Sequence, residues 1–325
     1  MVKTTWKPKF AVGIWIFGKV ADRFMVYREG DPLEKRFEKA ASIEGVEGVE
    51  IGYPMDFKEE EFDRVKELFK EYKLQPVAVL ADTFTDPLFM YGSYSSPKEE
   101  VRRKAVEITK KAMDFAEELG CNLINIWPGQ DGYDYMFQVN YEKAWKNFIE
   151  CIRECADYKP KVKIAIEYKL KEPRARIFIG CVGKALFLVN EVGRENVGVT
   201  LDIGHAFMAS ENPAESVALL GMKKKLFHVH MNDNDKTWDW DLIVGTCSFW
   251  DYLEFFLWLN LTGYDGWLSM DVYPYRVDPV KACTESVRNM KKILAVMEKV
   301  GVEKLKEIVE KGEIEETIKV IREAL

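Results

Sequence analysis

The stretch VGVTLDIGHAF, residues 197–207, guides how the rest of the chain is interpreted. Its first residues are apolar or β-branched, as in a parallel strand buried on both faces, and the run ends on the carboxylate of Asp202. His205 follows three residues later. The other two histidines of the chain, His228 and His230, lie in the next apolar run, KKKLFHVHMND. All three histidines therefore fall within or just after two expected strands.

Length and composition limit the class of protein. The 325 residues are 47% hydrophobic and 31% charged, and no apolar run approaches the roughly 18 residues of a membrane span. The start, MVKTTWKPKFAVG, lacks the apolar centre of a signal peptide, so we expect a cytoplasmic protein without a membrane partner. The net charge is −7, and lysine and arginine are dispersed among glutamates, which argues against a nucleic-acid partner. The six scattered cysteines are expected to be buried thiols.

Short apolar runs alternate with longer amphipathic stretches about eight times between residues 10 and 297. This alternation is typical of a parallel sheet with crossover helices. Several amphipathic stretches begin at Ser, Asn or Asp beside Pro and end at Gly, which are helix start and stop signals. The expected strands are residues 9–15, 46–52, 75–82, 122–128, 162–168, 197–204, 226–232 and 266–274. We predict an α/β chain with a (β/α)8 TIM barrel over residues 1–299 and a C-terminal helical extension over residues 300–325.

Acidic and imidazole side chains gather at the strand ends, where barrels of this class place their chemistry. Four consecutive strand ends carry a carboxylate or an imidazole, and the loop after the seventh strand adds two aspartates. These residues are Glu167, Asp202, His205, His230, Asp239, Asp241 and Asp271. Carboxylates brought so close would repel one another unless cations neutralise them, so we expect two divalent cations. Oxygen ligands with one imidazole per site favour Mg, Mn or Co over Zn, which stays an alternative.

Two further residues, Lys169 and His228, lie close to these ligands in the sequence. Lys169 lies two residues after Glu167, so on a strand both side chains face the same way, one as a ligand and the other as a cation beside the substrate. A plain salt bridge from Lys169 to Glu172 or Asp202 is the alternative. We interpret His228 as facing the opposite side of its strand and leave it out of the site.

Aromatic residues also follow the expected strands. Trp15 ends the first strand, Phe84 follows the third and Trp127 ends the fourth. Flat apolar walls suit the C–H faces of a sugar, although each ring can equally be plain core.

Four passages together resemble the xylose isomerase superfamily of TIM barrels over about residues 10–295. They are FTDPLFMYGSYSSPKEEVRRKAV (84–106), NIWPGQDGYDY (125–135), IEYKLKEPR (166–174), and KKKLFHVHMN (223–232) taken with WDWDL (238–242). The resemblance implies a first cation held by Glu167, Asp202, His230 and Asp271. It implies a second cation held by Asp202 as a bridge, His205, Asp239 and Asp241. The expected substrate contacts are Trp15, Phe84, Trp127, Lys169 and His205.

The chemistry that this resemblance implies is aldose–ketose isomerisation of a monosaccharide by a 1,2-hydride shift. Glu167 and Asp271 would act as ligands, while Lys169 would polarise the carbonyl of the substrate. A water held by Asp239 and Asp241 would move the hydroxyl proton.

The sequence departs from xylose isomerases in ways that bear on the substrate. Gly52 stands where they end the second strand on a histidine that helps to open the sugar ring, so ring opening needs another group. Asp202 and His230 replace a Glu and an Asp, and this ligand set is closest to the L-rhamnose isomerase branch. Phe24 lies where a neighbouring subunit of these enzymes contributes a Phe, so we expect a homo-dimer or homo-tetramer.

Alternatives to the isomerase remain open. A ketose 3-epimerase would exchange a proton between two carboxylates at C3. An endonuclease-IV-like phosphodiesterase would need more histidines and a basic path for DNA. A barrel that binds a sugar or a metal without catalysis is the last alternative.

Overall fold

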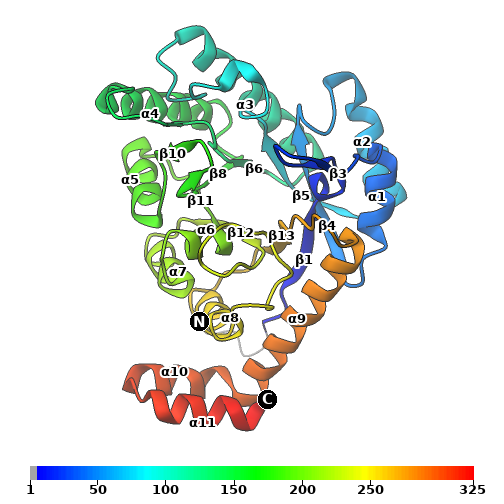
Figure 1. Ribbon diagram of the computed structural model, residues 1–325, viewed down its shortest axis with the longest axis vertical. Helices are drawn as coiled ribbons and strands as arrows, with labels where there is room; N and C mark the ends of the chain where they lie inside the picture. Colours follow the sequence, from blue (N-terminus) through cyan, green and yellow to red (C-terminus); the bar gives the residue numbers. More distant parts are fainter. Residues whose placement is uncertain (1–5) are drawn as a thin grey trace.

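The structure is a computed structural model that describes residues 6–325, so residues 1–5 of the expected barrel domain lie outside the described part. Eight parallel strands close into a barrel in the order β1, β13, β12, β11, β8, β6, β5, β4 (Figure 1). Their bounds are β1 (Lys9–Gly13), β4 (Val46–Tyr53), β5 (Gln75–Ala81), β6 (Leu123–Ile126), β8 (Lys163–Glu167), β11 (Val197–Asp202), β12 (Leu226–Met231) and β13 (Trp267–Met270). Each strand overlaps one expected run, and the predicted (β/α)8 barrel is confirmed.

Helices ring the barrel, as the chain order requires (Figure 1). They are α1 (Leu33–Ala41), α2 (Phe62–Glu71), α3 (Glu99–Leu119), α4 (Tyr141–Tyr158), α5 (Val182–Val192), α6 (Ile203–Met208), α7 (Pro213–Met222), α8 (Phe249–Leu261) and α9 (Pro279–Val300). The start signals act as expected, because the side chains of Asn212 and Asp278 cap α7 and α9 in front of a proline. Helix α3 stops at Gly120, whose φ of 80° is left-handed.

Two further helices form the C-terminal extension, which confirms that part of the prediction. Helices α10 (Val302–Lys311) and α11 (Ile314–Ala324) are separated by Gly312, whose φ is 68°. They lie outside the ring, beside the end of α9, and bury Leu305, Ile308 and Ile321 (Figure 1). No helix within residues 6–325 combines the length and the apolar character that crossing a membrane requires.

The loops after the barrel strands carry small elements that the sequence patterns did not indicate. A hairpin, β2 (Val20–Ala21) and β3 (Val26–Arg28), follows β1. A three-stranded antiparallel sheet joins β7 (Gly132–Tyr133), β10 (Ala175–Ile177) and β9 (Lys171–Glu172). Three 3₁₀ turns add η1 (Ile14–Phe17), η2 (Glu59–Glu61) and η3 (Pro87–Phe89). Because these loops leave the carboxyl ends of the strands, they build up one face of the barrel.

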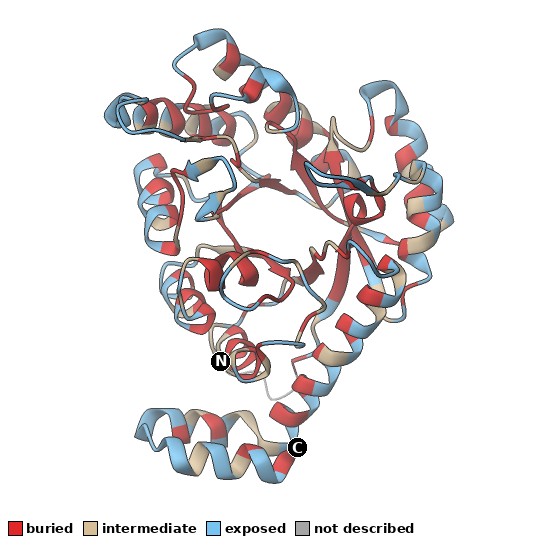
Figure 2. Cartoon of the chain, viewed as in Figure 1, coloured by how far each residue is buried: buried red, intermediate tan, exposed pale blue. Residues whose placement is uncertain are grey.

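The strands are the most buried part of the molecule, and Figure 2 shows the barrel wall largely in the colour of buried residues. All six residues of β11 are buried, as a strand covered on both faces requires. Parallel register then fixes which strand ends meet. It pairs Asp202 with His230 on the neighbouring strand, and Thr200 with Glu167 on the other side.

Close packing inside this wall gives a first prediction. A Cβ added at Gly198 on β11 would lie 2.5 Å from the ring of Phe227 on β12. We expect Gly198→Ala to lower the free energy of unfolding by about 1–3 kcal/mol, because a packed interior does not yield to an extra methyl group. The measurement is the midpoint of chemical denaturation.

The control is Gly183→Ala in α5, where the nearest atom to an added Cβ is 4.0 Å away. That change should be neutral or add up to about 1 kcal/mol. Equal midpoints for Gly198→Ala and wild type would contradict the packing described here.

Candidate metal and sugar site

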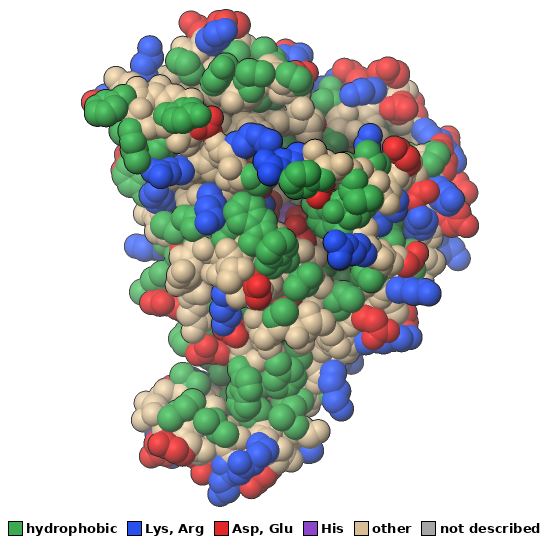
Figure 3. Space-filling model, viewed as in Figure 1, with side chains coloured by type: hydrophobic (Ala, Val, Ile, Leu, Met, Phe, Trp, Pro, Cys, Tyr) green, Lys and Arg blue, Asp and Glu red, His purple; other side chains and the backbone are tan. Residues whose placement is uncertain are grey.

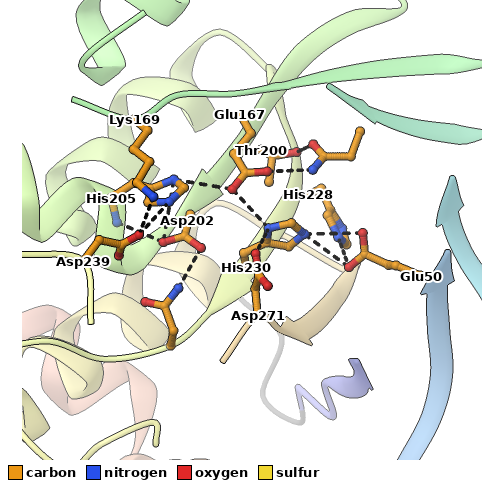
Figure 4. Close-up of polar contacts among 12 residues, drawn as sticks. Glu50, Glu167, Lys169, Thr200, Asp202, His205, His228, His230, Asp239 and Asp271 are labelled. Carbon is orange, nitrogen blue, oxygen red and sulfur yellow. Dashed lines mark hydrogen bonds and ion pairs between the residues drawn. The ribbon is translucent and has the colours of Figure 1, made fainter. Parts of the chain in front are cut away.

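The carboxyl ends of four neighbouring strands bring the expected ligands together. Glu167 is the last residue of β8 and Asp202 the last residue of β11. His230 is the penultimate residue of β12, and Asp271 comes directly after β13. In the close-up of Figure 4 their side chains point toward one another at the end of the barrel. His205 joins them from α6, the short helix that Asp202 caps by accepting a hydrogen bond from the backbone N–H of His205.

A cavity of about 350 Å³ opens above these residues. Figure 3 shows the hollow near the centre of this face, with acidic and histidine side chains at its bottom and hydrophobic side chains around it. The three expected aromatic residues, Trp15, Phe84 and Trp127, all line it. The rings of Phe84 and Trp127 pack edge to face with centroids 4.6 Å apart. A second cavity of about 760 Å³ shares lining residues with it, among them Pro173, Trp238 and Asp239.

Among the described residues, three groups of donor atoms meet the distance requirements of a shared ion, and two of them consist of the expected ligands. In each group the donor atoms lie within 4.8 Å of one another. The first group is Glu167, Asp202, His230 and Asp271. The second group is Asp202, His205 and Asp239. Asp202 belongs to both, in the position of a bridge. Asp241, the remaining expected ligand, lines the cavity but belongs to neither group.

The carboxylates of the first group are held from one side and open on the other. Asn125 donates a hydrogen bond of 2.7 Å to Oε2 of Glu167 and accepts one of 2.7 Å from the hydroxyl of Thr200. The indole of Trp15 donates to Oδ1 of Asp271 at 2.8 Å. These bonds leave Oε1 of Glu167 and Oδ2 of Asp271 to face the imidazole of His230. The protein thus orients Glu167 and Asp271 without using the oxygen that faces His230. Asp202 differs, because its two oxygens accept from the backbone N–H of His205 and from the side chain of Asn232.

The second group holds polar atoms that the protein leaves unsatisfied. Nδ1 of His205 and both carboxylate oxygens of Asp239 are buried without a well-formed hydrogen bond among the described residues. Their ion-pair distances are nevertheless short, with Nε2 of His205 3.2 Å from Oδ2 of Asp239. Buried imidazole nitrogens and carboxylate oxygens normally have a hydrogen-bond partner or a bound cation. A divalent cation between Asp202, His205 and Asp239 fits this group.

The pKa values show the electrostatic stress of the crowded carboxylates. Burial, together with Asp239 and Glu167, raises the pKa of Asp202 to about 7. Burial, reinforced by Asp239, likewise raises the pKa of Asp241 well above its usual range. At Glu167, in contrast, the two imidazoles of His230 and His205 outweigh burial and lower the pKa to about 2. More positive charge would relieve the repulsion at Asp202 and Asp241, and divalent cations fit this requirement.

Lys169 supplies one fixed positive charge at the edge of the centre. It lies just beyond β8, and its ammonium is 2.9 Å from Oδ2 of Asp239 and 2.5 Å from Oε1 of Glu172. The salt bridge to Glu172 was one alternative at the sequence level, whereas Asp239 was not considered as a partner. Burial disfavours the charge, but both carboxylates outweigh it and raise the pKa of Lys169. The ammonium also lies 5.3 Å from the ring of Trp127 in the cavity wall.

The expectation that His228 faces away from the site is wrong. Residues two apart on a strand share a face, and His228 and His230 both contact Glu50 inside the barrel. Glu50 and Asn125 are the residues near the ligands that the sequence analysis missed. Both stand within apolar strand runs, VEGVEIG and NLINIW, where a polar side chain has to find a partner. A polar residue inside such an apolar run was the sequence signal that could have identified Glu50 and Asn125.

Near the end of β4, where xylose isomerases have a histidine, this chain has Gly52, with other side chains close around it. Its backbone N–H donates to Oδ2 of Asp56 at 2.7 Å, and Arg36 pairs with the other oxygen at 2.7 Å. A Cβ at Gly52 would lie 2.8 Å from Cε of Met55, which lines the cavity at this point. The departure at Gly52 is therefore a real difference in the site.

A closed parallel barrel with clustered carboxylate and imidazole donors at the carboxyl ends of its strands defines the class of protein. The family model described as "Xylose isomerase-like TIM barrel" matches residues 37–300. The chain belongs to this family.

Relatives in this family include enzymes with different activities. A protein named xylose isomerase from Thermus thermophilus is 29% identical over 293 residues, which cover 83% of this chain and 74% of that protein. Among solved structures, a D-tagatose 3-epimerase-like protein superposes with a TM-score of 0.71 at 24% identity, covering 88% of this chain and 97% of its own. A D-allulose 3-epimerase from Methylomonas sp. gives 0.68 at 18% identity, covering 89% and 98%. The structural matches show the shared fold.

The charge distribution predicts how stability depends on pH and metal. Burial opposes a charge on His205, but Asp202 and Asp239 outweigh it and raise its pKa from 6.5 to about 9. The folded, metal-free protein thus holds a proton that the unfolded chain releases above pH 6.5, so its stability should fall as pH rises from 6.5 to 9.

Divalent cations should remove this fall, because they replace the proton. Thermal unfolding with a chelator, and with Mn²⁺ at about 100 times its Kd, should differ by about 2.7 kcal/mol, and by more at higher pH. His205→Asn should flatten the pH dependence of the metal-free protein. A metal-free melting temperature that rises from pH 6.5 to 9 would contradict these assignments.

Proposed function

We propose that this protein is a divalent-metal-dependent sugar isomerase that interconverts an aldose and a ketose by a 1,2-hydride shift. The observation that carries the proposal is Lys169, whose charged ammonium lies in the same cavity as both donor groups and 2.9 Å from Asp239. A cation fixed there suits the oxygen of a carbonyl that becomes negative during reaction. The relative named xylose isomerase supports this activity.

Each residue has a defined task in this reaction. Two divalent cations, Mg, Mn or Co in preference to Zn, would when bound supply positive charge to the sugar oxygens O1 and O2. Lys169 donates a hydrogen bond to O1. A water held by Asp239 and Asp241 carries the proton from O2 to O1, while hydride passes from C2 to C1, so atoms and electrons balance. The protein contributes positioning and charge, and it takes no atom from the substrate.

The cavity also suits a monosaccharide by shape. Trp15, Phe84 and Trp127 offer flat apolar faces to C–H groups. The indole nitrogen of Trp127 is a buried donor without a partner among the described residues, and a sugar hydroxyl would satisfy it. Phe24, which is 78% exposed on the β2–β3 hairpin, is free to contact a second copy in the expected homo-oligomer.

The second candidate is a ketose 3-epimerase. It is favoured by the placement of Glu167 and Asp271, which line one cavity from β8 and from the end of β13, with donor atoms within 4.8 Å. Two such carboxylates can remove and return a proton at opposite faces of C3. This reaction has no use for Lys169, which is the reason we place it second.

Proton NMR in heavy water distinguishes the two reactions. The Mg²⁺-loaded protein would be incubated with L-rhamnose, L-lyxose, D-xylose and D-tagatose. The isomerase should convert an aldose to a ketose with little deuterium at the transferred position, because the hydride does not exchange with solvent. Deuterium at C3 of a ketose would establish the epimerase instead, and an unchanged panel would contradict both.

Lys169→Met tests the residue that carries the proposal. We expect kcat to fall by about 10²–10³-fold, because a charged donor to the reacting oxygen is lost. Metal binding, followed by calorimetry, should remain. Lys163→Met is the matched control, since this exposed lysine begins β8, at the end of the strand away from Lys169. The kcat of Lys163→Met should equal that of wild type. Full activity of Lys169→Met would remove Lys169 from the mechanism.

A further inference from the structure

A second cluster of charged side chains lies deeper in the barrel, below the expected cation site. Glu50 on β4 reaches His228 and His230 on β12 (Figure 4). Its Oε1 is 2.9 Å from Nε2 of His228, and its Oε2 is 3.3 Å from Nε2 of His230. The three residues are at most 1% exposed. The reaction proposed above uses neither Glu50 nor His228.

We propose that Glu50 is a positioning residue for the first cation, and that it acts through His230. The inference rests on the proposed metal site. Glu50 accepts a hydrogen bond from Nε2–H of His230 and thereby fixes both the direction of the ring and the nitrogen that carries the proton. His228 holds Glu50 in place for this task.

The two nitrogens of His230 face opposite partners, and this decides their roles. Nε2 faces Glu50, whereas Nδ1 lies 3.3 Å from Oε1 of Glu167 and 3.6 Å from Oδ2 of Asp271. An ionised carboxylate can only accept, so Nε2 has to donate to Glu50. Without a cation, Nδ1 faces the carboxylate of Glu167 and donates to it as well. When a cation occupies the ligand group, the ring is neutral and carries one proton, which Glu50 keeps on Nε2, so Nδ1 directs its lone pair toward the cation. This is the orientation that a metal-binding histidine needs.

His228 completes the arrangement from the same strand. Glu50 extends from β4, three positions from β12 in the closed barrel, so its side chain spans the interior. A buried carboxylate is stable there only if hydrogen bonds compensate the loss of water. His228 provides the shortest one, and its ring packs edge to face on His230 with centroids 5.0 Å apart.

A third cation among these residues is the competing explanation, since their donor atoms also lie within 4.8 Å of one another. The separation of 2.9 Å between Glu50 and His228 is that of a direct hydrogen bond, which favours the positioning role. Counting bound metal decides between the two explanations.

The first experiment measures metal binding rather than turnover. Calorimetric titration of the chelator-stripped protein with Mn²⁺ gives the number of ions and the Kd of each. Wild type should bind two ions. Glu50→Gln should weaken the first-site Kd by about 10–100-fold, because the amide no longer accepts from both histidines. His228→Asn should fall between Glu50→Gln and wild type.

Asp131→Asn is the matched control for these variants. Asp131 is as buried as Glu50, at 0% exposure, but it bonds only Ser93 and Ser95 away from the ligands. This control should leave both Kd values unchanged. A third bound ion in wild type, or equal Kd values for Glu50→Gln and wild type, would overturn the proposal.

The second experiment needs no variant. The chain has only three histidines, so selective ¹⁵N-histidine labelling gives a simple spectrum of the Mg²⁺-loaded protein. We expect both His228 and His230 to be protonated at Nε2 and slow to exchange with solvent. A proton on Nδ1 of His230 would overturn the proposal. Both experiments are independent of sugar turnover, so an inactive protein that shows the expected binding would refute only the proposed function.

Discussion

The structure depends on the crowding of carboxylates that a closed parallel barrel forces at one rim. Parallel register sets Asp202 beside His230, and the neighbouring strands add Glu167 and Asp271. Burial, together with Asp239 and Glu167, raises the pKa of Asp202 to about 7 although His205 and His230 oppose the shift, so the folded chain holds these groups at an electrostatic cost. The barrel wall is stable enough to impose this cost, since its strands are buried almost throughout. A divalent cation among these carboxylates would lower this cost.

The residues of this site come from two parts of the structure, the barrel wall and the loops beyond the strands. The strand-end ligands and their partners Trp15 and Asn125 belong to the barrel wall or follow it directly. Lys169 and Asp239 lie on loops beyond the strands, where sequence changes leave the barrel intact. In the proposed reaction Lys169 is what separates an isomerase from an epimerase, so we expect loop residues rather than the strand ends to decide between the two chemistries. One fold is compatible with both, because function depends on the site.

The sequence predicts the barrel because the alternation of apolar runs and amphipathic stretches is local. It also predicts that the acidic and imidazole side chains at the strand ends meet, since the fold alone dictates where those ends lie. It did not reveal the contact of Glu50 with His228, which joins residues 178 positions apart and follows from barrel closure. The prediction that His228 faces away from His230 was wrong, because residues two apart on a strand lie on the same face. The hairpin β2–β3 and the small sheet β7–β10–β9 are too short for a periodic signal.

The cluster of Glu50, His228 and His230 joins the barrel interior to the candidate metal site, because His230 belongs to both. Its hydrogen bonds join protein groups alone, so they exist before any cation binds. In the proposed role of Glu50, the ring of His230 is already oriented for binding, so the side chain of His230 loses less conformational entropy when the cation binds. The same reasoning explains why a charged residue is tolerated within the apolar strand β4. An aliphatic side chain at position 50 would pack better, but it would leave two buried imidazoles without an acceptor.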